Sequence, residues 1–216
     1  MKQNIILIGG GGHCKSCIDV IEQEGSYQIV GIIDVKEKVG DKILGYPIIG
    51  TDNDLEKLSV DCDNFIITLG QIKSDKLRTR LFKRVIELNK NTPTIVSPMA
   101  YVSMHSTLGA GTIIMHNAIV NAGSIIGDNC IVNSHSLIEH DVIIGNYNHI
   151  STASIINGAE KDIVGEHINQ WVKGFNFNRW LDSDEVFAQT RRLKFIEDDY
   201  VADIMPIHVS DSIGEP

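Results

Sequence analysis

Residues 96–156 read VSPMAYVSMHSTLGAGTIIMHNAIVNAGSIIGDNCIVNSHSLIEHDVIIGNYNHISTASII. Every sixth position of this stretch holds an aliphatic side chain, eleven times in succession. These residues are Val96, Val102, Leu108, Ile114, Val120, Ile126, Val132, Ile138, Ile144, Ile150 and Ile156. An uninterrupted phase describes a repeating backbone unit, whereas an ordinary β-sandwich would show strands of variable length. The stretch therefore predicts a parallel β-helix of the hexapeptide type.

The residue that follows each aliphatic one is nearly always small or a turn former, which predicts a corner every six residues. Glycine occupies this corner at positions 109, 127 and 145, and the spacing of 18 predicts that three hexads close one turn of a prism. Stacked turns then form ladders such as Leu108, Ile126 and Ile144. We expect the glycine and asparagine corners to adopt positive φ, which β-branched residues avoid.

Short apolar runs in the first ninety residues predict strands over 4–8, 28–33 and 65–69. Helices are predicted over 14–22 and 75–88. On the second helix, the residues expected on one apolar side are Leu77, Leu81, Phe82, Val85 and Ile86. This order predicts a small parallel sheet with its ligand crevice at the carboxyl ends of the strands. The residues at those ends, expected to bind substrate, are Gly9, Gly10, Gly11, Gly12, His13, Asp34 and Gly70.

The glycine run does not match the dinucleotide fingerprint G-x-G-x-x-G, because Cys14 or Lys15 falls on the third glycine position. Backbone N–H groups at the start of the helix can still meet a phosphate. Asp34 can accept hydrogen bonds from a ribose or a base. The alternative interpretation is a tight turn that serves only to pack the helix on the strand.

The chain of 216 residues is 43% hydrophobic and carries a formal net charge of −9. This acidic balance argues against nucleic acid or an anionic membrane as the main partner, since both require a basic surface. No apolar run approaches the roughly 18 residues of a membrane span, and residues 1–8 resemble a first strand more than a signal peptide, which predicts a cytoplasmic protein. Cys14 and Cys17 form a C-x-x-C pair, for which packing and redox chemistry both remain open.

Chemistry is expected where the repeat breaks its own rule. Met115 and Glu139 are large residues at corner positions, and Glu139 is followed by His140 and Asp141. A histidine beside a carboxylate can act as a general base, because the anion fixes its tautomer and stabilises the imidazolium. A solvated loop histidine is the alternative. His149 replaces an aliphatic residue at an outward position, which suggests a contact with a ligand or a subunit.

A zinc site is a third hypothesis, because His135 and His140 are spaced as in the β-helical carbonic anhydrases. The position of the third ligand of those enzymes holds Met99 here, and His105 and His116 do not replace it. The sequence therefore favours a site without metal.

The chain resembles the bacterial sugar O-/N-acyltransferases, which include sialic acid O-acetyltransferases and N-acetyltransferases of nucleotide-linked 4-amino sugars. The resemblance rests on the glycine turn ending in Gly11-Gly12-His13, on Asp34, and above all on the block Asn133–Asp141. It implies a Rossmann-like nucleotide-sugar domain over 1–92 and a left-handed β-helix over 93–158. It also implies a homotrimer with acetyl-CoA in the groove between adjacent prisms.

The resemblance also implies roles for individual residues. His140 matches the general base and Asp141 the carboxylate that orients it. His149 falls where a histidine touches the thioester region of acetyl-CoA, and Gly158 falls where a backbone N–H serves as oxyanion donor. Asn133 is expected among the substrate-binding residues.

Three readings of the function stay open. N-acetylation of a nucleotide-linked 4-amino sugar is favoured slightly over O-acetylation of a sialic acid. The repeat phase stops near Asp162, so residues 159–216 form a divergent tail without a predicted structure. Because relatives use their later coils to bind the coenzyme, a catalytically impaired trimeric scaffold is the rival interpretation.

Overall fold

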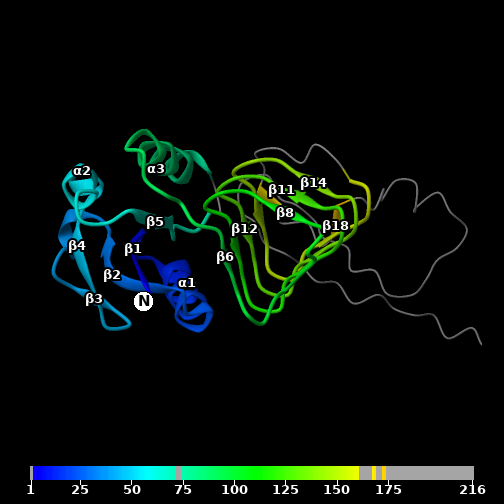
Figure 1. Ribbon diagram of the computed structural model, residues 1–216, viewed down its shortest axis with the longest axis horizontal. Coiled ribbons are helices and arrows are strands. Elements are labelled where there is room, and N and C mark those ends of the chain that lie inside the picture. Colours follow the sequence, from blue (N-terminus) through cyan, green and yellow to red (C-terminus); the bar gives the residue numbers. More distant parts are fainter. Residues whose placement is uncertain (1, 72–73, 161–166, 169–171, 174–216) are drawn as a thin grey trace, which may run out of the picture. The chain divides into compact units, whose positions relative to one another are not determined.

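The computed structural model describes residues 2–71 and 74–160, together with the backbone of 167–168 and 172–173. The chain divides into two compact units, and residues 1–174 form the first. This unit consists of an N-terminal α/β domain followed by coils of a β-helix (Figure 1). Of the tail expected over 159–216, the structure describes residues 159–160 and these two short backbone segments.

The N-terminal domain is built on a sheet whose strand order is β3-β4-β2-β1-β5. Its strands are β1 (Gln3–Ile8), β2 (Tyr27–Ile33), β3 (Lys42–Ile43), β4 (Tyr46–Gly50) and β5 (Asn64–Ile67). All pairings are parallel except that of β3 with β4, a pair that the sequence did not predict. The chain moves from β1 to β2 on one side and returns to the other side of β1 as β5. Such a reversal marks the place where parallel sheets bind ligands.

Helices cover both faces of this sheet. Helix α1 (Gly12–Glu24) packs on the face that carries Ile5 and Leu7, whereas α2 (Leu55–Leu58) and α3 (Lys76–Glu87) cover the face with Ile6 and Ile8. Two short 3-10 turns, η1 (Lys36–Lys38) and η2 (Asp52–Asp54), follow β2 and β4. Because both faces of the sheet are covered, residues 5–8 of β1 are all apolar and buried.

The apolar side of α3 differs from the one predicted. Leu77 and Ile86 are about half exposed, while Arg78 is buried. The guanidinium of Arg78 donates to the carbonyls of Ile67 and Leu69, so its hydrogen bonds satisfy the end of β5. Helical periodicity alone did not reveal a buried cation, because arginine normally lies outside a core.

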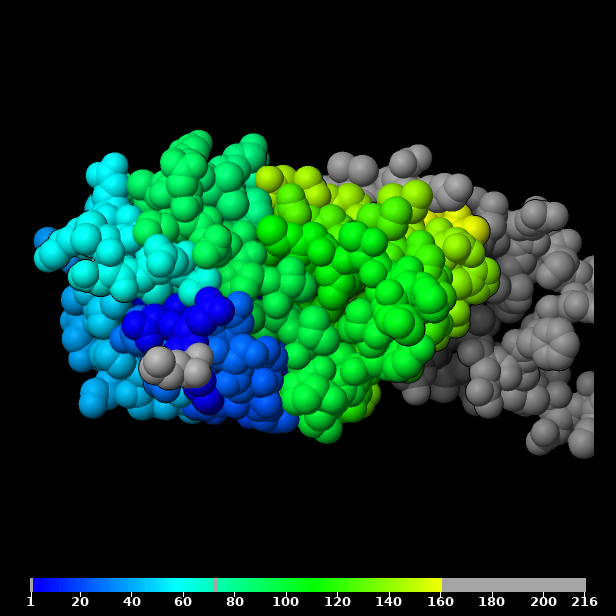
Figure 2. Space-filling view, in the orientation of Figure 1, coloured from blue at the N-terminus to red at the C-terminus, as the bar shows by residue number. Residues whose placement is uncertain are grey.

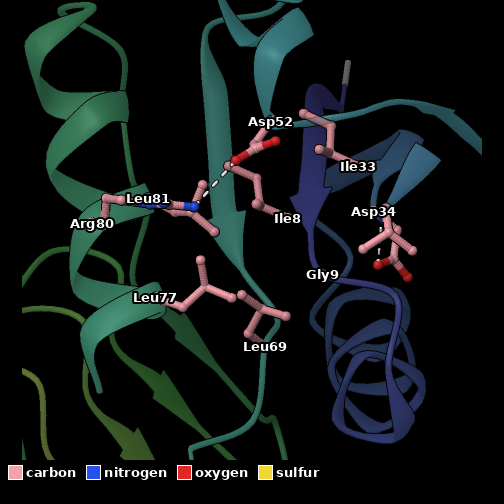
Figure 3. Close-up of a pocket in the computed structure, with 10 residues that line it drawn as sticks. Ile8, Gly9, Ile33, Asp34, Asp52, Leu69, Leu77, Arg80 and Leu81 are labelled. Atoms are coloured by element: carbon pink, nitrogen blue, oxygen red, sulfur yellow. Dashed lines mark hydrogen bonds and ion pairs between the residues drawn. The ribbon is translucent and has the colours of Figure 1, made fainter. Parts of the chain in front are cut away.

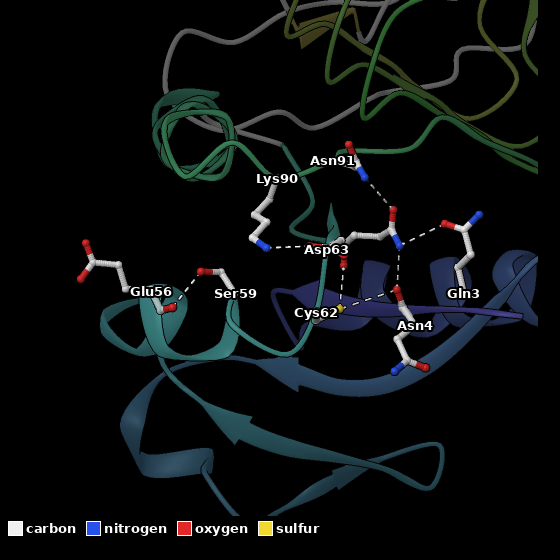
Figure 4. A network of polar contacts seen from close by, with 9 residues as sticks. Gln3, Asn4, Glu56, Ser59, Cys62, Asp63, Lys90 and Asn91 are labelled. Carbon is white, nitrogen blue, oxygen red and sulfur yellow. Dashed lines mark hydrogen bonds and ion pairs between the residues drawn. The ribbon is translucent and has the colours of Figure 1, made fainter.

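Polar side chains join β1, β5 and the loop after α3 at the amino end of the sheet (Figure 4). The Asn64 side chain donates to the Asn4 carbonyl at 2.9 Å and accepts from the Asn91 amide at 3.4 Å. The Cys62 thiol donates to the Asn64 carbonyl. Cys62 therefore has a structural role, as part of a network that aligns the first and last strands.

The β-helix begins directly after the N-terminal domain. Its two-residue strands are β6 (Ile95–Val96), β7 (Tyr101–Val102), β8 (Thr107–Leu108), β9 (Ile113–Ile114), β10 (Ile119–Val120), β11 (Ile125–Ile126), β12 (Ile131–Val132), β13 (Leu137–Ile138), β14 (Ile143–Ile144), β15 (His149–Ile150), β16 (Ile155–Ile156), β17 (His167–Ile168) and β18 (Val172–Lys173). They form three parallel sheets in which partners lie 18 residues apart everywhere except between β16 and β18, as in Leu108, Ile126 and Ile144. The predicted ladders are confirmed, and their aliphatic residues fill the prism.

The backbone conformation of the corners differs from the prediction. Residues with φ near +60° recur every six positions, but they lie three residues after the aliphatic one, as at Asn129, His135 and Asp141. The corner glycines at 109, 127 and 145 are not among the residues with positive φ. Glycine is required there by stacking, because a Cβ atom on Gly127 would lie 2.6 Å from the carbonyl carbon of Gly145.

One face of the prism is covered by the chain's own N-terminal domain. The outward residues Ile95, Ile113 and Ile131 share a core with α1, and so does the corner residue Met115. Figure 2 shows the N-terminal domain lying directly against the first coils. Packing against α1 therefore explains why Met115 departs from the rule of small corners. We call this sheet, formed by β6, β9, β12, β15 and β17, the covered face.

The ladders continue beyond residue 158. Strand β17 pairs with β15 at a spacing of 18, whereas Ile156 pairs with Lys173 at a spacing of 17. The hexad phase shifts at this point, which is why the sequence pattern shows no further repeat. None of the helices in the described part of the chain is long and apolar enough to cross a membrane.

Candidate functional site

His140 and Asp141 lie at an exposed corner of the β-helix. His140 Nδ1 and Asp141 Oδ2 are 2.9 Å apart, and both side chains are 65% exposed. Asp141 adopts the left-handed conformation, with a φ of 60°. This backbone turns its carboxylate back toward the preceding imidazole, so the pair arises within a single corner. An Nδ1–H donor to the carboxylate leaves Nε2 with a lone pair, as a general base requires.

Two glycines make room for this pair, one on the coil before and one on the coil after. A Cβ atom on Gly123 would collide with the carboxylate of Asp141, and one on Gly158 would lie 2.8 Å from Nε2 of His140. Gly158 therefore stands beside Nε2 of His140. The sequence reasoning missed Gly123, which stands 18 residues before Asp141.

His149 occupies the covered face and is 7% exposed. Its Nδ1 lies 2.6 Å from the Gln71 carbonyl, and its Nε2 lies 3.3 Å from the Asn133 amide nitrogen. Since a carbonyl only accepts, Nδ1 carries the proton and Nε2 accepts from Asn133. The ring centroids of His149 and His13 are 6.5 Å apart.

This arrangement brings together His13 and Asn133, both expected to bind substrate, and His149, expected to touch acetyl-CoA. A Cβ atom on Gly70 would lie 3.5 Å from the Cβ of His13, so Gly70 borders the same cluster. Burial, the positive charge of Arg78 and neighbouring His149 lower the pKa of His13 to about 3. His13 is therefore neutral near pH 7.

Arg78 connects the N-terminal domain to the β-helix. Besides the two carbonyls near the end of β5, its guanidinium donates to the side chain of Asn129 at 2.8 Å. Gln71 makes a second connection, since its amide donates to the Tyr147 carbonyl at 3.0 Å. The segment that leaves β5 is therefore fixed on the coil that carries His149. Neither Arg78 nor Gln71 was predicted, because their roles depend on pairing between distant segments.

A pocket of about 210 Å³ opens at the carboxyl ends of β1, β2 and β5, where the sequence placed the crevice. Its walls are largely aliphatic, with Ile8, Leu69 and Leu77 pointing toward its centre (Figure 3). Gly9 and Asp34, two of the residues expected to bind substrate, line it. The lining does not include Gly10, Gly11, Gly12, His13 or Gly70.

The glycine turn is open on the side of the helix start. A Cβ atom on Gly11 or Gly12 would meet nothing within 4 Å, whereas one on Gly10 would lie 2.6 Å from Asp34 Oδ2. Packing on the strand therefore does not explain Gly11 and Gly12. Asp34 accepts from the Val35 N–H and pairs with Lys38 Nζ at 2.8 Å. The carboxylate is thus held at the mouth of the turn.

The C-x-x-C pair is buried within the α1 core. Cys14 and Cys17 are both free and fully buried. Burial raises the pKa of the Cys14 thiol to about 11 and raises that of Cys17 further. Protonated, buried thiols are poor nucleophiles, which favours the packing interpretation. Within the described residues no cluster of three or more histidine, cysteine or acidic side chains is arranged to hold a metal ion.

Comparisons with known proteins match both parts of the chain. Residues 4–85 match the PglD N-terminal domain, and residues 105–140 match the bacterial transferase hexapeptide family (six repeats). No curated protein sequence matches the chain.

Several solved structures share the fold. PerB from Caulobacter crescentus, solved in complex with CoA and GDP-perosamine, has 28% sequence identity and a TM-score of 0.67 over 73% of each chain. The acetyltransferase domain of PglB from Neisseria gonorrhoeae, solved with acetyl coenzyme A, has 28% identity and a TM-score of 0.68 over 74% of this chain and 76% of that one. WeeI from Acinetobacter baumannii, at 18% identity and a TM-score of 0.59, shares the fold.

The prism, the exposed histidine–carboxylate corner and these matches define a hexapeptide-repeat acyltransferase. With a PglD-type domain preceding the repeats, the chain is an enzyme of the bacterial sugar O-/N-acyltransferase type. The predicted fold class, a Rossmann-like domain followed by a left-handed parallel β-helix, is confirmed.

Proposed function

We propose that this chain transfers the acetyl group of acetyl-CoA to the amine of a nucleotide-linked 4-amino sugar in the cytoplasm. The observation that carries the proposal is the exposed His140–Asp141 pair beside Gly158, on the same chain as a crevice at the ends of β1, β2 and β5. The solved structures that support it hold CoA with GDP-perosamine, or acetyl coenzyme A. The finer choice of an amine acceptor rests on these neighbours.

In the proposed reaction, His140 acts as the general base. Its Nε2 takes a proton from the acceptor amine as the amine nitrogen forms a bond to the thioester carbon. Asp141 accepts from Nδ1–H and stabilises the imidazolium that results. The tetrahedral intermediate then collapses, the carbon–sulfur bond breaks, and the coenzyme thiolate accepts the proton from His140. No acyl-enzyme is needed, because amine and thioester meet directly.

Gly158 contributes by its position beside His140. Since glycine has no side chain, the thioester can approach Nε2 from this coil, and the Gly158 N–H can donate to the oxygen that becomes negative. Among residues 2–71 and 74–160, no backbone hydrogen bond uses that N–H. A donor already in place lowers the barrier because it needs no reorganisation.

The nucleotide is proposed to bind in the pocket of the N-terminal domain. Asp34 stands where a ribose hydroxyl can donate to it, and the open turn at Gly11 and Gly12 lets backbone N–H groups approach a phosphate. His13, on the first turn of α1, lies outside the lining of this pocket, and its ring is 6.5 Å from that of His149 on the β-helix. The amino sugar is therefore proposed to extend from the pocket toward the prism.

A homotrimer is proposed because two faces of the prism bear exposed aliphatic residues beside the reactive corner. The faces formed by β7, β10, β13 and β16 and by β8, β11 and β14 meet at the corner of His140. Their outward side chains include Ile119, Ile125 and Ile155, all exposed. Cyclic trimers give each chain two neighbours, which is the number needed to cover both faces.

The experiment that tests the function is a transfer assay with separated products. The full-length protein is incubated with acetyl-CoA and a panel of free and nucleotide-linked 4-amino sugars, with a sialic acid as the alternative acceptor. We expect acetylated nucleotide sugar and free coenzyme A in equal amounts. Acetylation of the sialic acid alone would replace the proposal with O-acetylation, and no thioester cleavage with any acceptor would support the non-catalytic scaffold.

The trimer has a test of its own. Light scattering coupled to gel filtration should give three times the chain mass of 23.9 kDa. Ile125→Asp should reduce this mass to that of the monomer, whereas Val60→Asp, an exposed aliphatic position in the N-terminal domain, should not. A monomeric wild type would contradict the assembly.

A further inference from the structure

One edge of the pocket in the N-terminal domain carries two charged residues that were not predicted from the sequence to bind substrate. Asp52 and Arg80 both line it, and Arg80 Nη2 lies 3.3 Å from Asp52 Oδ2. Figure 3 shows this pair on one side of Ile8, with Asp34 on the other side beyond Gly9. The aliphatic side chains between them offer a surface for a flat ring. The pocket thus has a ribose acceptor at one edge and a donor–acceptor pair at the other.

The turn that carries Asp52 is held firmly. Asp52 is the first residue of η2. The start of η2 is fixed because the Thr51 N–H and the Thr51 hydroxyl both donate to Asp54 Oδ2 at 2.8 Å. Arg80 projects from α3. Because the Asp52–Arg80 pair is long and largely exposed, its own contribution to stability is small. A ligand can therefore engage both groups at little cost.

The pair offers a specific pattern of hydrogen-bonding groups. The Asp52 carboxylate presents two acceptors and the Arg80 guanidinium presents donors. Guanine presents adjacent N1–H and N2–H donors, which a carboxylate can accept together, and an O6 acceptor beside them. Uracil presents a single N3–H between two carbonyls, so the second carboxylate oxygen would face a carbonyl oxygen. Adenine presents only one amino donor on the corresponding edge of the base, so the second oxygen of the Asp52 carboxylate would stay unpaired.

We propose that Asp52 and Arg80 read the base of the nucleotide and select guanine, so that the acceptor is a guanosine-diphosphate-linked amino sugar. This inference rests on the proposed function, since it names the nucleotide of the same substrate. Asp52 accepts from N1–H and N2–H of the base, while Arg80 donates to O6. Asp34 holds the ribose at the opposite edge.

The test measures nucleotide affinity directly. Isothermal titration of the full-length protein with GDP, UDP and ADP should give a dissociation constant for GDP at least about tenfold below the other two, as one bidentate base contact supplies. Asp52→Asn should weaken GDP binding by about tenfold or more and leave UDP binding nearly unchanged. The preference for GDP should then disappear.

Asp63→Asn is the matched control, because Asp63 is also an exposed carboxylate paired with a cation, Lys90, but lies outside the pocket. It should bind GDP as the wild type does. Equal or tighter binding of UDP, or unchanged GDP binding by the Asp52→Asn variant with its melting temperature retained, would overturn the assignment while leaving acetyl transfer intact. Failure of all three nucleotides to bind would overturn it together with the nucleotide-linked acceptor. Acetylation of free amino sugars would then still test the catalytic corner.

Discussion

Asp141 Oδ2 lies 2.9 Å from His140 Nδ1, and Asp141 can reach it because its own backbone is left-handed, with a φ of 60°. Adjacent residues in an extended strand point to opposite sides, so two neighbours rarely cooperate there. At this corner the chain turns from β13 to β14, and the two neighbouring side chains meet. The repeat that builds the prism therefore also builds the base and its orienting carboxylate.

Asp141→Asn should preserve the fold and lower kcat by about 10²-fold or more, because the amide no longer stabilises the imidazolium. Asparagine tolerates the left-handed conformation, so the backbone needs no adjustment. Steady-state transfer kinetics with circular dichroism check this expectation. A variant with wild-type kcat would show that the carboxylate is not needed.

Gly158→Ala should reduce transfer, because the new Cβ would lie 2.8 Å from His140 Nε2 and occupy the approach of the thioester. We expect kcat/KM for acetyl-CoA to fall at least about tenfold, while the melting temperature changes little. Substrate-saturation kinetics provide the measurement. If the variant reacts normally, the coenzyme approaches His140 from another side.

Gly127→Ala should destabilise the β-helix, since its Cβ would press against the backbone of the next coil. Overpacking of this kind costs about 1–3 kcal/mol. Denaturant unfolding measures the loss. The control is Gly12→Ala, where the added Cβ meets nothing and stability should hold or rise slightly. Equal effects of the two substitutions would disprove the stacking argument.

The pKa of His13, lowered to about 3, predicts a pH dependence of stability. As pH falls below about 6.5, the unfolded chain binds this proton and the native chain does not, so the stabilisation present above pH 6.5 is lost toward pH 3. The contribution to the slope is at most about 1.4 kcal/mol per pH unit. Unfolding free energies of wild type and His13→Gln, measured between pH 4 and 7, should show a flatter dependence in the variant. The same slope in both would mean that His13 already titrates in the folded protein.

Most of the β-helix could be predicted from the sequence because each coil repeats one local rule. The spacing of Leu108, Ile126 and Ile144 determined their ladder, and the large residue Glu139 drew attention to His140. The conformation of the corners was predicted wrongly. Glycine can occupy a corner either because the backbone there has a positive φ or because the next coil lies too close for a Cβ atom. The sequence alone does not distinguish these two reasons.

The remaining features depend on contacts between distant segments. Arg78 is buried because β5 and Asn129 together supply its acceptors, and Gln71 reaches His149 across the junction of the two domains. His149 was expected to face a ligand or a subunit, which stays a prediction, and within this chain it packs against the N-terminal domain. No periodicity encodes such pairings, so they emerged only from the structure.

The most direct test of the account is acetyl transfer by His140→Ala, measured as coenzyme A released and acetylated acceptor formed. The account predicts that the His140→Ala variant transfers no acetyl group, while its light scattering and circular dichroism match those of the wild type. The His135→Ala variant, which lacks another exposed histidine of the prism, should retain activity. Full activity of the His140→Ala variant would contradict the central claim that this imidazole is the general base.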